Sequence, residues 1–229
     1  MQPFTRHTGI AVPLPRANID TDLIIRIERF MLVPRRELGA YAFEMLRHRS
    51  DGSTDPDCPL NQPCFAGASI LIAGANFGCG SSREAAVWAL AGMGIRSVIA
   101  PSFGDIFREN CVKNGILPIV LDAAACEELS ARLLTGEGGH RISIDLTAQR
   151  LTPLGGQEIP FAIGAFEREQ LLAGEDEVAT TLRRRRQILD HLDRWEAAEP
   201  WSRLILAGSP LLEPIPSTLQ DHEEGKTSP

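Results

Sequence analysis

The sequence has no long apolar run. None of its segments approaches the roughly 20 consecutive apolar residues that a helix needs to cross a bilayer, although 43% of the 229 residues are hydrophobic. Residues 1–16 also lack the basic and then apolar layout of a secretion signal. We therefore expect a cytoplasmic protein that does not associate with a membrane.

The sequence also lacks the residue spacings that usually mark a metal site. Its cysteines are odd in number, and no two of them are separated by the two residues typical of zinc and iron–sulfur sites. The histidines show no ligand spacing either. We therefore expect this chain to hold no metal and no cofactor of its own. The cysteines are Cys58, Cys64, Cys79, Cys111 and Cys126.

An excess of positive charge is absent as well. The formal net charge is −7 and the isoelectric point is near 5.3, which argues against binding to the phosphate backbone of a nucleic acid. The one basic run, residues 183–186, is typical of a solvated helix face. We expect no nucleic-acid partner.

The apolar pattern predicts one main α/β domain. Buried strands are predicted to alternate with amphipathic helices in the middle of the chain, and short alternating segments that follow predict antiparallel strands. The predicted strands are residues 10–14, 69–73, 97–100, 116–121, 140–146, 150–154 and 158–163. The predicted helices are residues 37–47, 82–93, 103–114, 123–134 and 176–198. This mixture predicts a three-layer domain over residues 1–198.

The two ends of the chain differ in character. Residues 18–22 and 50–63 are rich in polar and turn-forming residues and are predicted to be loops. Residues 176–198 repeat apolar side chains at nearly helical spacing, which predicts a long amphipathic helix that packs on the domain. Residues 199–229 contain Gly and Pro breaks and a polar end, so we expect a flexible tail.

A glycine-rich turn at residues 75–84 is the most informative segment. It joins the end of a predicted strand to the start of a predicted helix, which is the edge where α/β proteins collect ligands. Backbone amides at such a turn and the helix N-terminus favour an anion. Ser81, Ser82 and Arg83 would add hydroxyl groups and a guanidinium that fits a carboxylate. These groups would suit a small carboxylic acid as the ligand.

Other interpretations of this turn also follow from the residues. Ser81 and Glu84 have the spacing of a capping box, which needs no ligand. A nucleotide site fits less well, because Arg83 replaces the third glycine of a dinucleotide motif and the lysine of a phosphate-binding loop is missing. The sequence has no Gly-x-Ser-x-Gly motif for a serine hydrolase. A nucleophilic Cys79 has no histidine base marked beside it.

Four motifs in order along the chain carry a resemblance to a known family. They are residues 18–22 (Asn-Ile-Asp-Thr-Asp), residues 76–84 (Asn-Phe-Gly-Cys-Gly-Ser-Ser-Arg-Glu), residues 102–107 followed by Asn110, Cys111, Asn114, Gly115 and Leu117, and residues 171–176 followed by Thr181 and Leu182. With them, residues 4–198 resemble the small subunit of 3-isopropylmalate dehydratase, which is similar to the swivelling fourth domain of aconitase. The resemblance implies a β/β/α domain followed by a C-terminal helix.

Two positions depart from the family pattern. Ala85 stands where the family usually has histidine, and Arg26 stands where a proline is common. Neither change touches the serines or the arginine of the turn. Both changes leave open which acid is the natural substrate.

The resemblance also implies a division of labour between two subunits. A large subunit would carry a four-iron, four-sulfur cluster whose open iron binds the substrate hydroxyl. This chain would close over the cluster, with Ser81 as the base that removes a proton and with Ser82 and Arg83 binding the carboxylates of a small dicarboxylic acid. Asp22 would orient polar groups nearby, or form a simple turn. Arg35 and Arg36 lie in the loop that senses the variable part of the substrate, or are solvated at the surface.

The implied reaction is the isomerisation of 2-isopropylmalate and 3-isopropylmalate by loss and return of water, in leucine biosynthesis. One alternative is a hydratase for another small diacid, such as citraconate, dimethylmaleate or homoaconitate. A second alternative is a non-catalytic binding module that keeps the fold but has no cluster-bearing partner.

Overall fold

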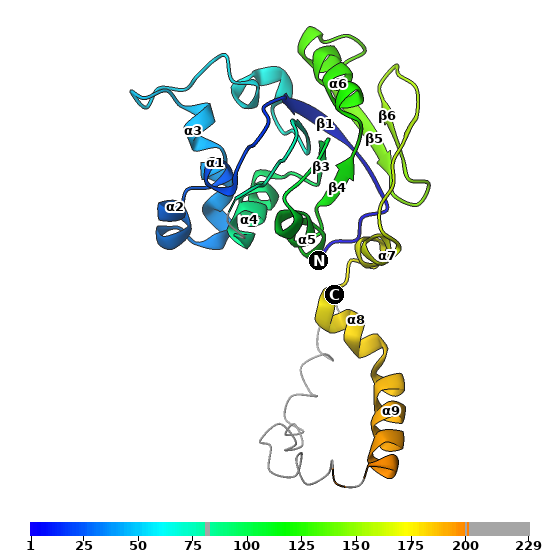
Figure 1. Cartoon of the computed structure of the whole chain (residues 1–229). Helices are drawn as coiled ribbons and strands as arrows, with labels where there is room; N and C mark the ends of the chain where they lie inside the picture. Colours follow the sequence, from blue (N-terminus) through cyan, green and yellow to red (C-terminus); the bar gives the residue numbers. More distant parts are fainter. Residues whose placement is uncertain (81–82, 200, 202–229) are drawn as a thin grey trace, which may run out of the picture. The chain divides into compact units, whose positions relative to one another are not determined.

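A computed structural model of the chain describes residues 1–80, 83–199 and 201 (Figure 1). The chain divides into two compact units, residues 1–180 and residues 181–229. The first unit holds all the strands found in the described part of the chain. The domain boundary expected after residue 198 stays a prediction, and most of the expected tail lies outside the described residues.

Seven strands build the first unit in the order β4-β3-β2-β1-β5-β6-β7. The first four run parallel and the last three are added antiparallel. The bounds are β1 (Arg6–Leu14), β2 (Ile70–Ala73), β3 (Ser97–Ala100), β4 (Leu117–Val120), β5 (Arg141–Asp145), β6 (Arg150–Pro153) and β7 (Ile159–Pro160). This mixed arrangement confirms the predicted α/β class.

Strand β1 joins the two groups of strands. Its second half, from Ala11 to Leu14, pairs in parallel with β2, whereas its first half, from Arg6 to Ile10, pairs antiparallel with β5. The predicted strand began only at Ile10, because the first half carries polar residues such as Arg6 and Thr8 that give no apolar signal. Strand β1 therefore belongs to both the parallel part and the antiparallel part of the sheet.

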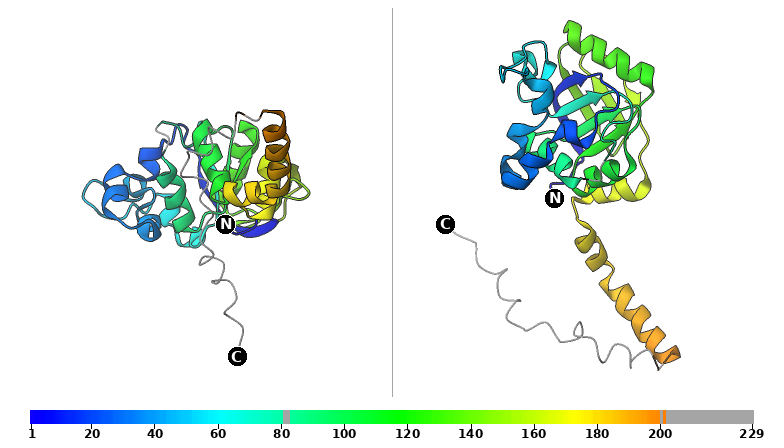
Figure 2. Two further views of the ribbon diagram at one scale, coloured as in Figure 1. Left: turned by 90° about the horizontal axis from the view of Figure 1, so that it is seen from below. Right: turned by 60° about the vertical axis from the view of Figure 1, so that its left-hand side comes forward.

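Two helices, α4 (Glu84–Met93) and α5 (Asp105–Lys113), connect the parallel strands β2, β3 and β4, and α6 (Ala123–Thr135) leads from β4 to the antiparallel strand β5. The crossovers from β2 to β3 and from β3 to β4 step in the same direction along the sheet, so right-handed connections place α4 and α5 on one face. Helix α6 packs on β1, β2 and β3. Figure 1 shows α6 above the strands with α4 and α5 below them, and Figure 2 shows the same elements from two further directions.

The segment between β1 and β2 folds into short helical pieces beside α4. They are α1 (Thr21–Ile24), α2 (Ile27–Leu32), η1 (Arg35–Tyr41), α3 (Glu44–Arg47), η2 (Pro59–Asn61) and η3 (Pro63–Phe65). The predictions of a loop at residues 18–22 and of one helix at residues 37–47 were therefore wrong in detail. Phe43 interrupts the predicted helix with a φ of 56°, because its side chain is fully buried and its N–H donates to the Ile24 carbonyl at 2.9 Å.

The core lies around β2 and β3, whose residues are all buried. Next to it, η1 lies directly against α4, with Gly39 facing Gly92. A Cβ added at Gly39 would lie 2.1 Å from the Gly92 carbonyl carbon, so any larger residue would separate the two helices. This packing fixes α4, which carries the glycine-rich turn at its start.

After the sheet the chain continues as α7 (Ala165–Ala173), α8 (Glu177–Arg183) and α9 (Arg185–Ala198). The sequence predicted a single helix at residues 176–198, but Arg184, with φ −92° and ψ 8°, separates α8 from α9. Four consecutive arginines at this point place like charges one turn apart, which disfavours a continuous helix. None of the helices in the described residues has the length and apolar content to span a membrane.

Candidate active site

Three loops meet where β1, β2 and β3 end. Residues 18–20 follow β1 and lead into α1, residues 75–80 follow β2, and residues 102–104 follow β3. Isolated β-bridges pair Asp20 with Cys79 and Phe77 with Phe103, so the loops continue the parallel order of the strands. The carboxyl edge of a parallel sheet is where such proteins bind ligands. The structure thus brings together three of the four motifs, which are far apart in the sequence.

Two asparagines shape the floor of this edge. Asn18 and Asn76 both have left-handed backbones, with φ of 55° and 58°, a conformation that asparagine tolerates better than most residues. The Asn76 side-chain amide donates to Asn18 Oδ1 at 2.8 Å, and the Asn76 backbone N–H donates to Ser102 Oγ at 2.8 Å. One residue from each loop takes part, so these bonds hold the three loops together.

Gly78 sets the path of the glycine-rich turn. Its φ is 71°, and a Cβ at this position would lie 2.1 Å from the ring of Phe107 on α5. Its N–H donates to the Ile19 carbonyl at 2.7 Å, and the next carbonyl, of Cys79, accepts from Thr21 N–H at 3.1 Å. The turn is therefore pressed onto α5 on one side and bonded to residues 18–22 on the other.

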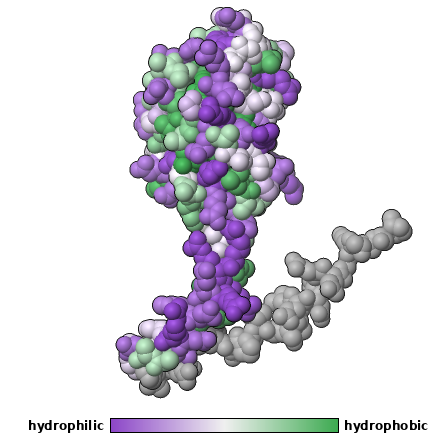
Figure 3. Space-filling model, turned by 90° about the vertical axis from the view of Figure 1, so that its right-hand side faces the viewer, coloured by the Kyte–Doolittle hydropathy of each residue, from purple (hydrophilic) through white to green (hydrophobic). Residues whose placement is uncertain are grey.

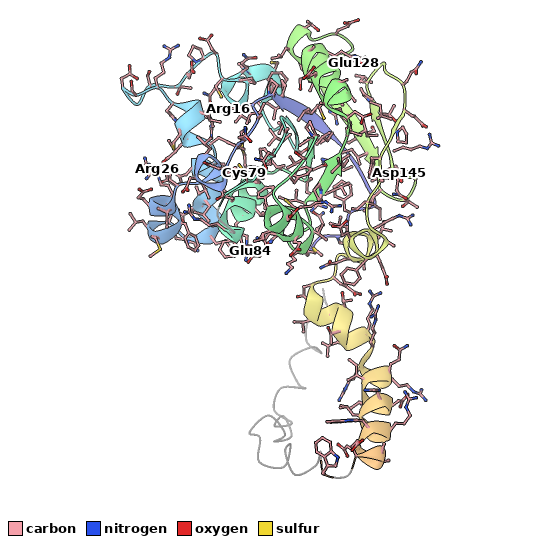
Figure 4. All side chains as sticks on the ribbon, viewed as in Figure 1. Arg16, Arg26, Cys79, Glu84, Glu128 and Asp145 are labelled. Atoms are coloured by element: carbon pink, nitrogen blue, oxygen red, sulfur yellow. The ribbon has the colours of Figure 1, made fainter. Side chains whose placement is uncertain are left out.

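The turn leads to Arg83, the residue that precedes α4. Its guanidinium forms an ion pair with the Asp22 carboxylate on α1. The Arg83 side chain is 23% exposed and that of Asp22 is 53% exposed, so the pair is open to solvent on the Asp22 side. Figure 4 labels Cys79 in the turn and Glu84 at the start of α4. The predicted substrate-binding residues Arg83 and Asp22 are thus brought together at the helix N-terminus.

The serines of the turn, Ser81 and Ser82, lie outside the described residues. Their roles as base and carboxylate ligand remain predictions. The alternative capping box loses its support, because α4 begins at Glu84 with Arg83 as the N-cap, whereas a box starting at Ser81 would place Glu84 in the third helical position. The Glu84 carboxylate instead accepts a hydrogen bond from the Asn114 side chain at 2.8 Å.

Arg35 and Arg36 have different surroundings. Arg35 donates to Asn114 Oδ1 at 3.0 Å, and its guanidinium carbon lies 4.3 Å from the centre of the Trp88 ring. Through Asn114 it is linked to Glu84, one residue from Arg83. The Arg36 side chain is 83% exposed and pairs with its neighbour Glu37 at 3.3 Å. Their roles in sensing substrate stay predictions, and only Arg35 is tied to the start of α4.

The local side-chain contact with the backbone that a turn role predicts for Asp22 is made by Asp20 instead. The Asp20 carboxylate accepts from Leu23 N–H at 2.8 Å and so caps α1, which leaves the Asp22 carboxylate free for Arg83. Both residues are aspartates of the same Asp-Thr-Asp segment, so the sequence alone does not distinguish them. Their roles differ because α1, which the sequence did not predict, begins between them at Thr21.

The cysteines give no sign of metal binding. Among residues 1–80, 83–199 and 201, no group of three or more His, Cys, Asp or Glu side chains is placed to hold a metal ion, so these residues do not fit an iron–sulfur cluster. Burial raises the pKa of the Cys111 thiol well above its usual value and, with help from Asp122 and Glu127, raises the pKa of Cys126 to about 11. Cys79 is half-buried within the turn.

Sequence reasoning missed the supporting contacts of the site. Asn114 was only one residue of a motif, but its side chain donates to the Asn110 carbonyl at 2.9 Å and links Arg35 to Glu84. Sequence reasoning gave Ser102 no role, although the Ser102 hydroxyl bonds the turn. The available sign of the left-handed turns was the residue type itself, since asparagine tolerates this backbone conformation better than most residues. The distant partners of these residues depend on the fold and leave no local pattern.

A comparison with known protein families assigns this chain to a class. The family model described as the aconitase C-terminal domain matches residues 1–124 of this chain. That range includes β1 to β4, the glycine-rich turn and all the predicted site residues. The chain therefore carries an aconitase C-terminal domain.

Similar proteins narrow the class to one family. The 3-isopropylmalate dehydratase small subunit of Rhodospirillum centenum is 47% identical over 202 residues, which cover 88% of this chain and 99% of that protein. The protein of the same description from Hahella chejuensis is 42% identical and covers 88% of this chain and 97% of its own length. This chain belongs to the family of 3-isopropylmalate dehydratase small subunits.

A solved structure agrees with this assignment. The crystal structure of 3-isopropylmalate dehydratase from Methanocaldococcus jannaschii aligns with a TM-score of 0.56 at 29% sequence identity, covering 81% of this chain and 98% of that one. The resemblance inferred from the four motifs is confirmed, and so is the aconitase-like fold.

Proposed function

We propose that this chain is the small subunit of a two-subunit hydro-lyase that interconverts 2-isopropylmalate and 3-isopropylmalate, and that its glycine-rich turn supplies the base and the carboxylate-binding groups. The observation that carries the proposal is the pairing of Arg83 with Asp22 where α4 begins. The pair with Asp22 is made through Nη1, and a guanidinium has five N–H donors in a planar fork, so Arg83 could bind a substrate carboxylate as well.

The substrate would be a small dicarboxylic acid. One carboxylate would displace or share the Asp22 side of Arg83, which is the exposed side of the ion pair. Ser82 would donate a hydroxyl hydrogen bond to the same group. A planar guanidinium can bind a carboxylate through two parallel hydrogen bonds, so Arg83 would fix both the position and the orientation of the acid.

Ser81 would remove the proton from the carbon next to the one that bears the hydroxyl. Loss of that proton and of hydroxide gives a carbon–carbon double bond and water, and return of water with the opposite placement gives the isomer. A serine hydroxyl is a weak acid in water, so its anion needs support. The α4 N-terminus and the Arg83 charge would supply it, and exclusion of water would strengthen both.

A second subunit is needed for the other half of the reaction. The cluster expected on the large subunit would supply a Lewis acid for the substrate hydroxyl. This chain would provide the opposite wall, with its turn facing the partner. The enzyme would work in the cytoplasm, without nucleic acid or membrane.

Reconstitution tests this function. The chain is combined anaerobically with the cluster-loaded large subunit from the same organism, and ultraviolet absorption follows the unsaturated intermediate formed from 2-isopropylmalate, 3-isopropylmalate, citramalate and homocitrate. We expect turnover only with both subunits and the highest kcat/KM with the isopropylmalates. A preference for another acid would assign the related hydratase, and a chain that never adds activity to the large subunit would contradict the proposal.

A further inference from the structure

Helix α2 presents its apolar side chains to solvent. Four of its six residues are apolar, yet the helix contributes no buried residue to the core. We define the outer face of α2 as four side chains whose exposed fractions run from 40% to 81%. They are Ile27 at 46%, Phe30 at 40%, Met31 at 71% and Leu32 at 81%. Folding of this chain alone gives no reason for such a sequence.

The polar residues around α2 are the ones that attach it to the molecule. Arg29 donates to the Glu44 carboxylate on α3 at 2.8 Å, and its guanidinium lies 4.3 Å from the centre of the Tyr41 ring. Arg26, at the N-cap, lies 3.7 Å from the same carboxylate, whose side chain is only 14% exposed. A surface helix normally turns its apolar face inward and its charges outward. In α2 the apolar side chains are as exposed as the charged ones, since the Arg29 side chain is 41% exposed and that of Glu28 is 58% exposed.

Apolar surface of this kind marks an interaction site when it is contiguous. Phe30 and Met31 lie three and four residues after Ile27, so these three side chains share one face of the helix, and Leu32 follows Met31 in the chain. On the side of the molecule seen in Figure 3, to the right in Figure 1, apolar residues are scattered among polar ones. Helix α2 lies on the left in Figure 1, beside α1 and α4.

The outer face of α2 borders the candidate active site. Helix α1, which carries Asp22, comes directly before it in the chain, and the Phe30 ring lies 6.1 Å from the ring of Trp88. Trp88 stands one helical turn after Glu84 in α4. The same edge of the molecule therefore holds the Arg83–Asp22 pair and, next to it, an uncovered apolar surface.

We propose that the outer face of α2 docks onto the large subunit. This inference rests on the proposed function, because a dehydratase site that opens at the α4 N-terminus must be closed by the partner, and the rim of the site is then the first surface to be covered. The face has the composition of an interface centre, with large apolar side chains, an aromatic ring and arginines at its base. A helix that only faces solvent would not need these large apolar side chains.

The test is a binding measurement with the intact subunits. The variant carries Met31→Asp and Leu32→Asp, and its control carries Leu134→Asp and Leu154→Asp, two residues exposed to 54% and 57% on α6 and after β6. Both variants add two negative charges at exposed positions. Biolayer interferometry gives the dissociation constant for the cluster-loaded large subunit, and circular dichroism compares thermal midpoints.

We expect the α2 variant to bind the large subunit at least about tenfold more weakly, as for residues at the centre of an interface, with an unchanged thermal midpoint. The control should bind like the wild type. A milder pair, Met31→Ala with Leu32→Ala, should weaken binding in the same direction. Wild-type affinity of the aspartate variant would overturn the proposal.

Two other occupants give different results. If α2 contacts the branched part of the substrate, the dissociation constant of the subunits stays unchanged while the KM for isopropylmalate rises. If a second copy of this chain covers α2, the wild type is a dimer by light scattering and the variant is a monomer with unchanged affinity for the large subunit. Either result would overturn docking on the large subunit. Failure of the proposed function looks different again, since the wild-type subunits would bind but give no turnover.

Discussion

At the scale of single residues, the site depends on how Arg83 is held. Its guanidinium is paired with Asp22 on α1. Asp20 caps α1 by accepting a hydrogen bond from Leu23 N–H, so the Asp22 carboxylate is not used for the cap. Arg83 therefore meets an incoming acid already oriented, which lowers the entropic cost of binding. The geometry of one guanidinium, more than its charge, should determine affinity.

Replacing Arg83 with lysine tests this statement. Lysine keeps the positive charge but cannot form two parallel hydrogen bonds to a carboxylate. We expect Arg83→Lys in the reconstituted complex to raise KM for 3-isopropylmalate by about tenfold, close to 1.4 kcal/mol, with a smaller change in kcat. Arg150→Lys is the control, since Arg150 lies on β6 and pairs with Glu158. An unchanged KM for Arg83→Lys would exclude a two-pronged contact.

Variants of Arg35 test whether this residue, predicted to sense substrate, also stabilises the fold. Its contacts are with Asn114 and Trp88, so its removal should loosen the start of α4. We expect Arg35→Ala and Asn114→Ala to be non-additive in the free energy of unfolding of the isolated chain, with a coupling of roughly 0.5 kcal/mol. Urea denaturation of the two single variants and the double variant gives the coupling. Full additivity would show that the two side chains act independently.

The residues of the site were more predictable than their contacts. Family resemblance and the preference of helix N-termini for anions selected Arg83 and Asp22, and the structure brings them together. The links made by Asn114 and Ser102 could not be predicted, because each depends on the distance between segments dozens of residues apart in the chain. Ser81 and Ser82 lie outside the described residues, so their roles rest on the sequence.

At the scale of elements, the glycine-rich turn connects the candidate site to the surrounding helices. It is pressed against Phe107 on α5 and bonded to the loop after β1, so α1, α4 and α5 are set by one segment. A change in the turn should therefore affect the stability of the whole unit as well as activity.

Gly78→Ala tests the turn. The positive φ disfavours any residue with a Cβ, and the added methyl group would overlap the Phe107 ring. We expect a loss of about 3 kcal/mol in the free energy of unfolding, from the sum of backbone strain and overpacking. Gly52→Ala, with a φ of 84° and no atom within 4 Å of the added Cβ, should lose only about 1 kcal/mol. Equal losses would mean that the contact with Phe107 does not constrain the turn.

The central elements were predictable because their patterns are local. Strand β3 matches its prediction residue for residue, and α6 differs by one residue, since continuous apolar runs and regular helical spacing specify both. The segment between β1 and β2 was not predictable in the same way. Phe43 adopts a left-handed backbone to reach the core, and α2 has its apolar residues outside, so tertiary contacts override the local pattern there.

At the scale of the whole molecule, stability should fall in mild acid. The pKa of His7 lies below its usual value of 6.5, mainly because of burial and also because of the nearby Arg96 charge. The unfolded chain then binds a proton at a higher pH than the folded chain does. The stability contributed by neutral His7 is complete above pH 6.5 and is lost as the pH falls toward the folded pKa.

Urea unfolding of the wild type should therefore show a lower free energy at about pH 5.5 than at about pH 7.5. The variant His7→Asn should show a smaller difference between the two conditions, since it removes the titrating group. His7 Nε2 lies 2.7 Å from Ser69 Oγ, and asparagine keeps a polar group on β1. The same pH dependence in both proteins would assign the acid sensitivity to other groups.

The whole enzyme is expected to extend beyond this chain. The described residues supply a guanidinium, a carboxylate and a rigid turn, and the relatives of this chain are described as small subunits, so we expect a large subunit to supply the rest of the site. Activity should appear only when both are assembled. A variant that removes the base should leave the assembly intact, because the turn itself is held by backbone bonds and by Phe107.

The most direct measurement is the turnover of Ser81→Ala in the reconstituted complex with 3-isopropylmalate. We expect kcat to fall by at least about a thousandfold, in the range seen when an enzyme loses its base, while the dissociation constant of the two subunits stays at the wild-type value. Ser82→Ala should mainly raise KM. Near-normal kcat of the Ser81→Ala complex, with assembly verified by light scattering, would contradict the role of this turn in catalysis.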